Sequence, residues 1–194
     1  MLKRLLQDKS LWILLALNIW CIIYYLQNPS EFGSIVWLYW AQSVFIGIFN
    51  FLDILTLPTH PVNPGAYESG SKGCSAFFFL FHYEAFHVAY SIFIVSGYRV
   101  NPRFILIALT GFIFNLGLQF VQHKIVQRSL PVNVGKMFFM PYLRILPMHL
   151  MILAPVFLHI QASVLFLVLK TLADVIMYVL TTPIYKQTFQ KIKK

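Results

Sequence analysis

The chain has 194 residues, of which 59% are hydrophobic and only 11% are charged. Soluble domains carry about 25% charged residues, so this composition excludes a water-soluble globular protein. The formal net charge of +9 fits either nucleic acid or anionic lipid as a partner, and the positions of the basic residues decide between them. We therefore expect a polytopic membrane protein.

Six apolar segments follow one another along the chain, and each is close to the about 20 residues that a membrane-spanning helix needs. They lie at about 11–27, 35–58, 74–97, 104–122, 142–160 and 162–183. Turn-forming pairs separate them, such as Asn28-Pro29 and Asn101-Pro102. The sequence therefore predicts an all-α fold with six transmembrane helices in one bundle, which forms a single domain over residues 1–194.

The Lys and Arg residues of the connections are distributed unevenly between the two sides of the predicted bundle. Twelve fall on one side and two on the other. The larger group is Lys3, Arg4, Lys9, Lys72, Lys124, Arg128, Lys136, Arg144, Lys186, Lys191, Lys193 and Lys194, and the smaller is Arg99 and Arg103. Because cytoplasmic loops carry the excess of basic residues, we expect both termini in the cytoplasm and the protein in the inner membrane. Membrane lipid is then the expected partner, and nucleic acid is not.

Several polar residues interrupt the apolar segments, and a charge at the bilayer centre costs at least about 2.5–3.5 kcal/mol. They are His82, Glu84, His87, His149, Lys170 and Asp174, together with Asn50 and Asn115. Counting from the cytoplasmic helix ends at 1.5 Å per residue places His82, His149 and Asp174 at a common depth of roughly 10–14 Å. The two asparagines come out at the same level. We expect a polar layer inside the bundle.

His82, His149 and Asp174 have the residue types of a two-histidine, one-carboxylate site, which suits zinc or iron. In this interpretation the protein is a metal-dependent intramembrane enzyme for an apolar or lipid-like substrate, with a metal-bound water as the reactive group. Asp174 and Glu84 are then the candidate catalytic carboxylates. Two alternatives stay open, namely haem ligation by the two histidines and interhelical hydrogen bonds that only fix packing.

A second set of polar residues suggests a proton-coupled transporter. Glu84 and His87 lie on one face of the third segment because they are three residues apart. Lys170 comes out at a similar depth to His87, so it could pair with Glu84 between helices or with Asp174 along its own helix. A carrier would change the protonation or pairing of these residues. Arg144 could bind an anionic group at the mouth of the site, or it could simply extend to the interface.

Three groups of residues are distinctive. They are Trp40-Ala41-Gln42-Ser43 with Asn50, His82-Tyr83 with Phe86, and Arg144-Ile145 with His149, followed by Lys170-Thr171-Leu172-Ala173-Asp174. In these residues the chain resembles a family of uncharacterised bacterial multi-pass membrane proteins, domain of unknown function 6498.

The resemblance points to His82, His149, Lys170 and Asp174 as site residues, and it supplies no activity. The family pattern places a second histidine eight residues after the first, where this chain has Tyr90. This difference weighs against two metal ligands from one helix. Whether the protein is an enzyme, what its substrate is and how many copies assemble are left open by the sequence.

Overall fold

The computed structural model describes residues 7–57, 69–95, 100–127, 137–143, 145–146 and 164–181. These residues form helices and contain no strand. The elements are α2 (Lys9–Gln27), the short 3-10 helix η1 (Pro29–Glu31), α3 (Phe32–Leu55), α4 (Ser69–Val95), α5 (Pro102–Gln127) and α7 (Val164–Thr181). A further helical stretch covers residues 137–143. The prediction of an all-helical fold is confirmed for the described residues.

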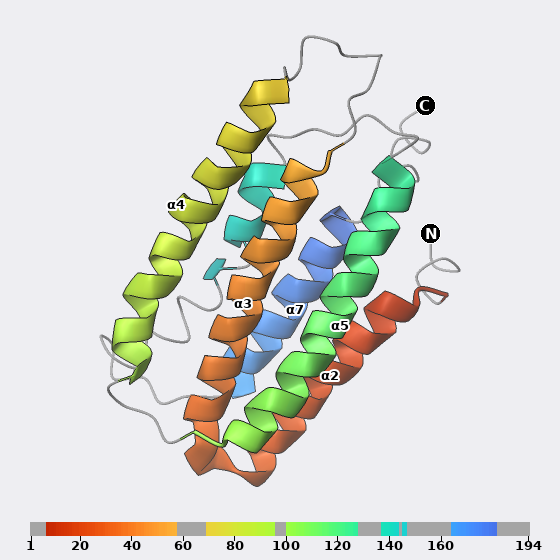
Figure 1. The fold of residues 1–194 in the computed structure, drawn as a ribbon. Coiled ribbons are helices and arrows are strands. Elements are labelled where there is room, and N and C mark those ends of the chain that lie inside the picture. Colours follow the sequence, from red (N-terminus) through yellow and green to blue (C-terminus); the bar gives the residue numbers. More distant parts are fainter. Residues whose placement is uncertain are drawn as a thin grey trace.

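The long helices lie side by side, and α2, α3, α4 and α5 alternate in direction (Figure 1). α3 packs against α4 and against α5, whereas α2 packs against α5 and α7. α3 and α2 are therefore the helices through which the other three are joined.

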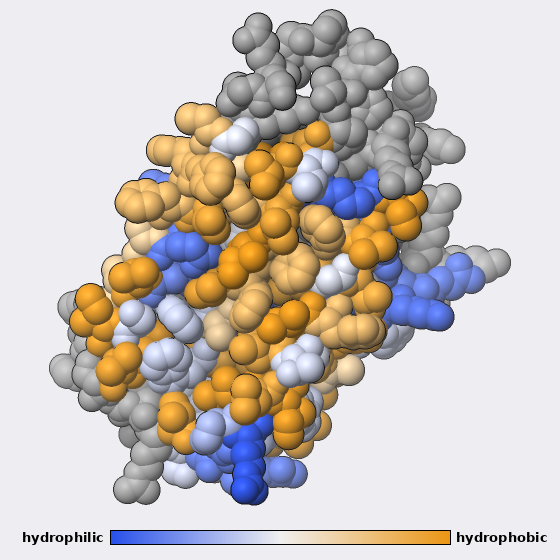
Figure 2. Space-filling model, viewed as in Figure 1, coloured by the Kyte–Doolittle hydropathy of each residue, from blue (hydrophilic) through white to orange (hydrophobic). Residues whose placement is uncertain are grey.

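Among the described residues, three stretches are long and apolar enough to cross a membrane: Lys9–Gln27, Pro29–Leu55 and Pro102–Ile125. Large apolar side chains remain on the outside, as with Phe81 of α4, which is 82% exposed. Figure 2 shows hydrophobic residues over much of the visible face of the helices. An apolar surface of this extent is matched to lipid rather than to water.

The three candidate spans among the described residues are fewer than the six predicted. Two further helices fall within predicted spans: α4, which carries His82, Glu84 and His87 in its apolar part, and α7, which has 18 residues. Most of the predicted span 142–160 lies outside the described residues. The six-span topology therefore stays a prediction.

Capping residues set several of the helix ends. The Asp8 side chain accepts hydrogen bonds from the backbone N–H groups of Ser10 (3.0 Å) and Leu11 (3.3 Å) at the start of α2, as an N-cap residue does. Asn101 accepts similarly from the N–H of Phe104 (3.3 Å), and Pro102 occupies the first helical position, where a missing N–H is tolerated.

Two helices are longer than the apolar segments that predicted them. α4 begins at Ser69 rather than near 74, and α5 continues to Gln127 rather than ending near 122. Helical hydrogen bonding continues beyond the apolar region because polar residues can also form helical turns. The second segment differs in the opposite sense, since α3 ends at Leu55 rather than near 58.

The contact between α2 and α5 generates a prediction about close packing. A Cβ at Gly111 would lie 2.7 Å from Leu17 Cδ2, whereas one at Gly117 would meet nothing within 4 Å. We expect Gly111→Leu to destabilise the folded protein by about 1–3 kcal/mol, the usual cost of overpacking. Gly117→Leu on the same helix is the matched control and should leave stability unchanged. Thermal unfolding in detergent measures both, and equal midpoints for the two variants would contradict this packing.

Candidate functional site

A buried ion pair lies on α7. Lys170 Nζ is 2.6 Å from Asp174 Oδ2, and the two side chains are only 8% and 6% exposed. The residues are four apart, so both project from the same face of the helix. Of the two pairings that the sequence allowed for Lys170, the one along its own helix is therefore present.

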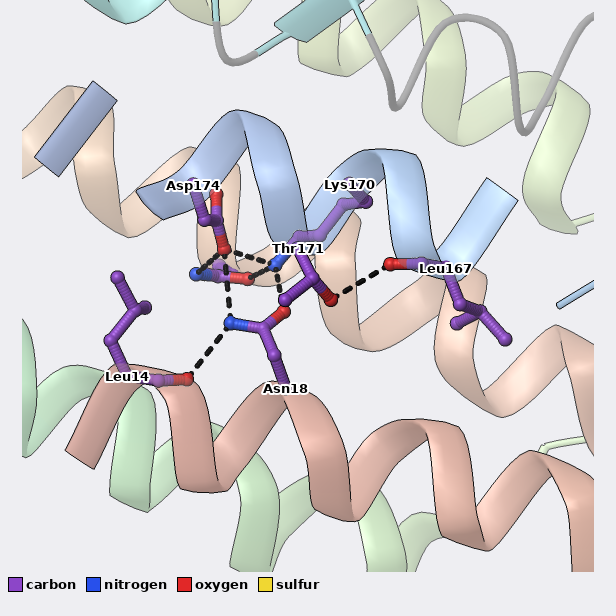
Figure 3. A network of polar contacts seen from close by, with 7 residues as sticks. Leu14, Asn18, Leu167, Lys170, Thr171 and Asp174 are labelled. Carbon is purple, nitrogen blue, oxygen red and sulfur yellow. Dashed lines mark hydrogen bonds and ion pairs between the residues drawn. The ribbon is translucent and has the colours of Figure 1, made fainter. Parts of the chain in front are cut away.

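Two amide side chains join this pair to other helices. Asn18 of α2 accepts from Lys170 Nζ through Oδ1 (3.1 Å) and donates to Asp174 Oδ2 through Nδ2 (3.3 Å). Gln42 of α3 does the same, accepting from Lys170 at 2.6 Å and donating to Asp174 at 3.4 Å. Figure 3 shows Asn18 reaching from α2 towards both charged residues. Each amide thus contacts both the positive and the negative member of the pair.

Aromatic rings complete the surroundings of the ammonium group. Lys170 Nζ lies 3.8 Å from the ring centroid of Tyr39 and 5.1 Å from that of Phe112. A cation is attracted to the face of an aromatic ring, most strongly where water is excluded. The Lys170–Asp174 cluster, defined as these two residues with Asn18, Gln42, Tyr39 and Phe112, therefore combines side chains from α2, α3, α5 and α7. It stabilises one positive charge inside an apolar bundle.

A second polar cluster lies between α3 and α4. Ser43 and Tyr83 share a hydrogen bond between their hydroxyl groups (3.0 Å), and Trp40 Nε1 donates to the carbonyl oxygen of His87 (2.9 Å). His87 Nδ1 is 3.4 Å from Glu84 Oε2, so these two residues lie on the same face of α4, as predicted. The ammonium group of Lys170 instead bonds Asn18, Gln42 and Asp174.

A third cluster joins α3 to α5 near the ends of both helices. Asp53 Oδ1 is 2.7 Å from Lys124 Nζ, and Asp53 Oδ2 is 3.6 Å from His123 Nδ1. Lys124 also donates to the backbone oxygen of Asp53 (2.9 Å). Asp53 and His123 were not among the predicted site residues. Both lie close to the expected ends of their apolar segments.

The predicted polar layer is not a single level. Asn115 accepts from the Ser10 hydroxyl (2.9 Å), whereas Asp174 bonds Asn18. Ser10 and Asn18 are eight residues apart on α2, which is about 12 Å along the helix axis. Counting depth from each helix end fails here because α5 continues twelve residues beyond Asn115 and passes the start of α2.

The remaining predicted residues have separate surroundings. Asn50 donates to the backbone oxygen of Met137 (3.0 Å), which ties the stretch 137–143 to α3. His82 is exposed on α4, and its Nδ1 is 2.7 Å from the Tyr142 hydroxyl. His149 and Arg144 lie outside the described residues.

The described part of the chain contains no group of three His, Cys, Asp or Glu residues placed to hold a metal ion. His82 contacts the Tyr142 hydroxyl, whereas Asp174 bonds Asn18, Gln42 and Lys170. A site that needs His149 as a third ligand is left untested, and it stays a prediction. Cys21 and Cys74 are free thiols.

Two members of the cluster, Asn18 and Gln42, were not predicted as site residues, although Gln42 lies in one of the distinctive groups of the sequence. The available signal was their position, since each is an amide near the middle of an otherwise apolar run, where a polar group needs a partner.

The comparisons with known proteins agree with the resemblance. A model described as "Family of unknown function (DUF6498)" matches residues 1–188. The chain belongs to the DUF6498 family. Neither the curated proteins nor the solved structures give a significant match. Membership of DUF6498 therefore covers nearly the whole chain, and the chemistry of the site has to be argued from the residues themselves.

The pairing of Lys170 with Asp174 can be tested by a double-mutant cycle. Removing one member of a buried pair leaves an uncompensated charge and costs about 3–5 kcal/mol, whereas replacing both by apolar residues costs much less. We expect Lys170→Met and Asp174→Leu to lower the unfolding midpoint in detergent, and the double variant to recover most of the loss. Leu169→Met, beside the cluster on the outer face of α7, is the control. Additive losses in the double variant would contradict the pairing.

Proposed function

We propose that this DUF6498 protein is a six-span carrier of the bacterial inner membrane, with both termini in the cytoplasm, that uses the Lys170–Asp174 cluster to exchange protons. The observation that supports the proposal is a buried ion pair that two amides contact from neighbouring helices. Ionisable residues inside a transmembrane bundle often mark an ion or proton path.

The chemistry of the cluster suits a change between two pairings. In the described arrangement Asp174 is neutralised by the ammonium group of Lys170. A proton that binds to the Asp174 carboxylate removes the negative charge, so Lys170 loses its counter-ion and its position becomes unfavourable in an apolar interior. Protonation of one residue would thus move the other.

The two amides would couple this change to the helices. Asn18 and Gln42 each accept from Lys170 and donate to Asp174. When the pair separates, both amides lose a partner, and unsatisfied polar groups are costly without water. α2 and α3 would then have to shift relative to α7.

The experiment is a proton-binding measurement that needs no knowledge of the cargo. Liposomes containing the protein are adsorbed on a solid-supported membrane and exposed to a jump from mildly alkaline to mildly acidic buffer. We expect a transient charge displacement in the wild type because protons bind inside the membrane, and loss of this transient in Lys170→Met/Asp174→Leu.

All of these samples carry the further substitution Glu84→Gln, so that another buried carboxyl group cannot supply the signal. Leu169→Met in the same background serves as the control and should keep the transient. A transient that is unchanged in the double variant would contradict proton exchange at this cluster.

Metal-dependent intramembrane chemistry at His82, His149 and Asp174 is our second proposal. It is supported by the contact between His82 Nδ1 and the Tyr142 hydroxyl, which orients the ring and leaves Nε2 for a ligand, as partners of metal-binding histidines do. Against it, a divalent cation at Asp174 would approach the ammonium of Lys170, 2.6 Å from the same carboxylate. These like charges repel, so Asp174 fits the metal poorly while Lys170 is paired.

Elemental analysis of the purified protein tests this second proposal. It predicts near-stoichiometric zinc or iron in the wild type and loss of the metal in both His82→Ala and His149→Ala. Phe78→Ala, beside His82 on α4, controls for damage to that helix. An optical spectrum of the same samples tests haem ligation, because haem absorbs strongly. A metal-free, colourless wild type would rule out both ideas.

A further inference from the structure

Glu84 has an unusual environment in the interface between α3 and α4. Its Oε1 atom is buried and has no hydrogen-bond partner among the described residues. Its Oε2 atom lies 3.4 Å from His87 Nδ1. Within the described part of the chain, no Lys or Arg side chain lies at ion-pair distance from this carboxyl group.

Gly47 provides the space that the carboxyl group occupies. A Cβ on Gly47 would lie 2.4 Å from Glu84 Oε1 and 2.6 Å from Tyr83 Cδ1, distances too short for real contacts. Trp40, Ser43 and Gly47 follow one another at helical spacing on α3, so they form one face of that helix. The first two bond α4, and the third leaves room for the carboxyl group.

Among the described residues, no Lys or Arg supplies a positive charge beside Glu84. On its own helix, His87 Nδ1 is 3.0 Å from the carbonyl oxygen of Tyr83. A carbonyl can only accept, so Nδ1 carries a hydrogen in this bond, and the neutral imidazole can supply it without a positive charge. The facing residues of α3 are a tryptophan, a serine and a glycine, none of which is charged at any ordinary pH.

The geometry points to Glu84 as a proton-binding carboxyl group inside the membrane, separate from the Lys170–Asp174 cluster. An ionised carboxylate in this position would be buried with one oxygen unsatisfied, and the cost of burying an unpaired charge is far larger than that of a neutral hydroxyl. The group is therefore held as the neutral acid, and the ligand of the site is a proton. Since Glu84 is 23% exposed, a reagent dissolved in the lipid can reach it.

This inference does not rest on the carrier proposal, because it concerns the protonation of one residue and needs no cargo. It makes a chemical distinction between the carboxyl groups of the bundle. Asp174 is paired with Lys170 and Asp53 with Lys124, so both are ionised. Of these three carboxyl groups, Glu84 is the one that retains its proton.

Dicyclohexylcarbodiimide, an apolar reagent, tests the difference because it reacts with the protonated form of a carboxylic acid. The acid adds across one C=N bond to give an O-acylisourea, which rearranges to a stable N-acylurea that contains the whole reagent, and nothing is released. We expect peptide mass spectrometry at neutral pH to find the added reagent on Glu84 and not on Asp53 or Asp174. Glu84→Gln should lose the modification completely.

The His87→Phe variant separates this inference from its rival, which is a pair between ionised Glu84 and protonated His87. If Glu84 is neutral, His87→Phe should be modified as fully as the wild type. If the rival is correct, the wild type stays unmodified and modification appears only in His87→Phe. Gly47→Ala should reduce the modification by filling the space at Oε1, with Gly117→Ala as the control. An unmodified Glu84 in the wild type from mildly acidic to mildly alkaline pH would overturn the inference.

Discussion

The Lys170–Asp174 ion pair constrains the rest of the bundle, because a charge buried in an apolar helix bundle has to be neutralised and hydrogen-bonded at the same place. α7 supplies both charges, and α2 and α3 each supply one amide that contacts both of them. A rotation of any of these helices by one residue position, about 100°, would remove a side chain from the cluster. Individual interhelical hydrogen bonds in membranes contribute only about 0.6–2 kcal/mol. The specific arrangement of the helices therefore depends on several such bonds to the same ion pair.

The other polar contacts are placed along the helix interfaces at different heights. Near the start of α2, Asp8 accepts from the Tyr178 hydroxyl (2.8 Å) and Ser10 bonds Asn115. At the end of α3, Asp53 bonds Lys124. These contacts pair two helices at a time, whereas the Lys170–Asp174 cluster joins three by hydrogen bonds. This distribution fits a bundle in lipid whose helix positions are set by polar contacts. Between helices in lipid there is no hydrophobic driving force, because lipid tails are as apolar as the side chains.

The helical fold could be predicted from the sequence because length and hydropathy are local properties of each segment. The Lys170–Asp174 pair was one of the two pairings that the sequence left open, because a spacing of four residues places both on one helix face without knowledge of any neighbour. Asn18 and Gln42 could not be assigned to it, because their contacts depend on how α2 and α3 are rotated towards α7. The expected layer of Asn115 with Asp174 was wrong for a related reason: helix ends do not lie in one plane, so depth counted from them is not a common coordinate.

α3 presents two different polar environments on its two sides, and this difference bears on function. Towards α2 and α7, Gln42 and Tyr39 contribute to a charge pair whose hydrogen bonds are satisfied in one defined arrangement. Towards α4, Ser43 bonds the Tyr83 hydroxyl, and Gly47 borders a carboxyl group with an unsatisfied oxygen. A satisfied pair resists change until a proton alters one of its charges, whereas a neutral acid can give up its proton only when a cation or water reaches it. Because one helix contributes to both sites, a movement of α3 that opened one of them would also alter the contacts of the other.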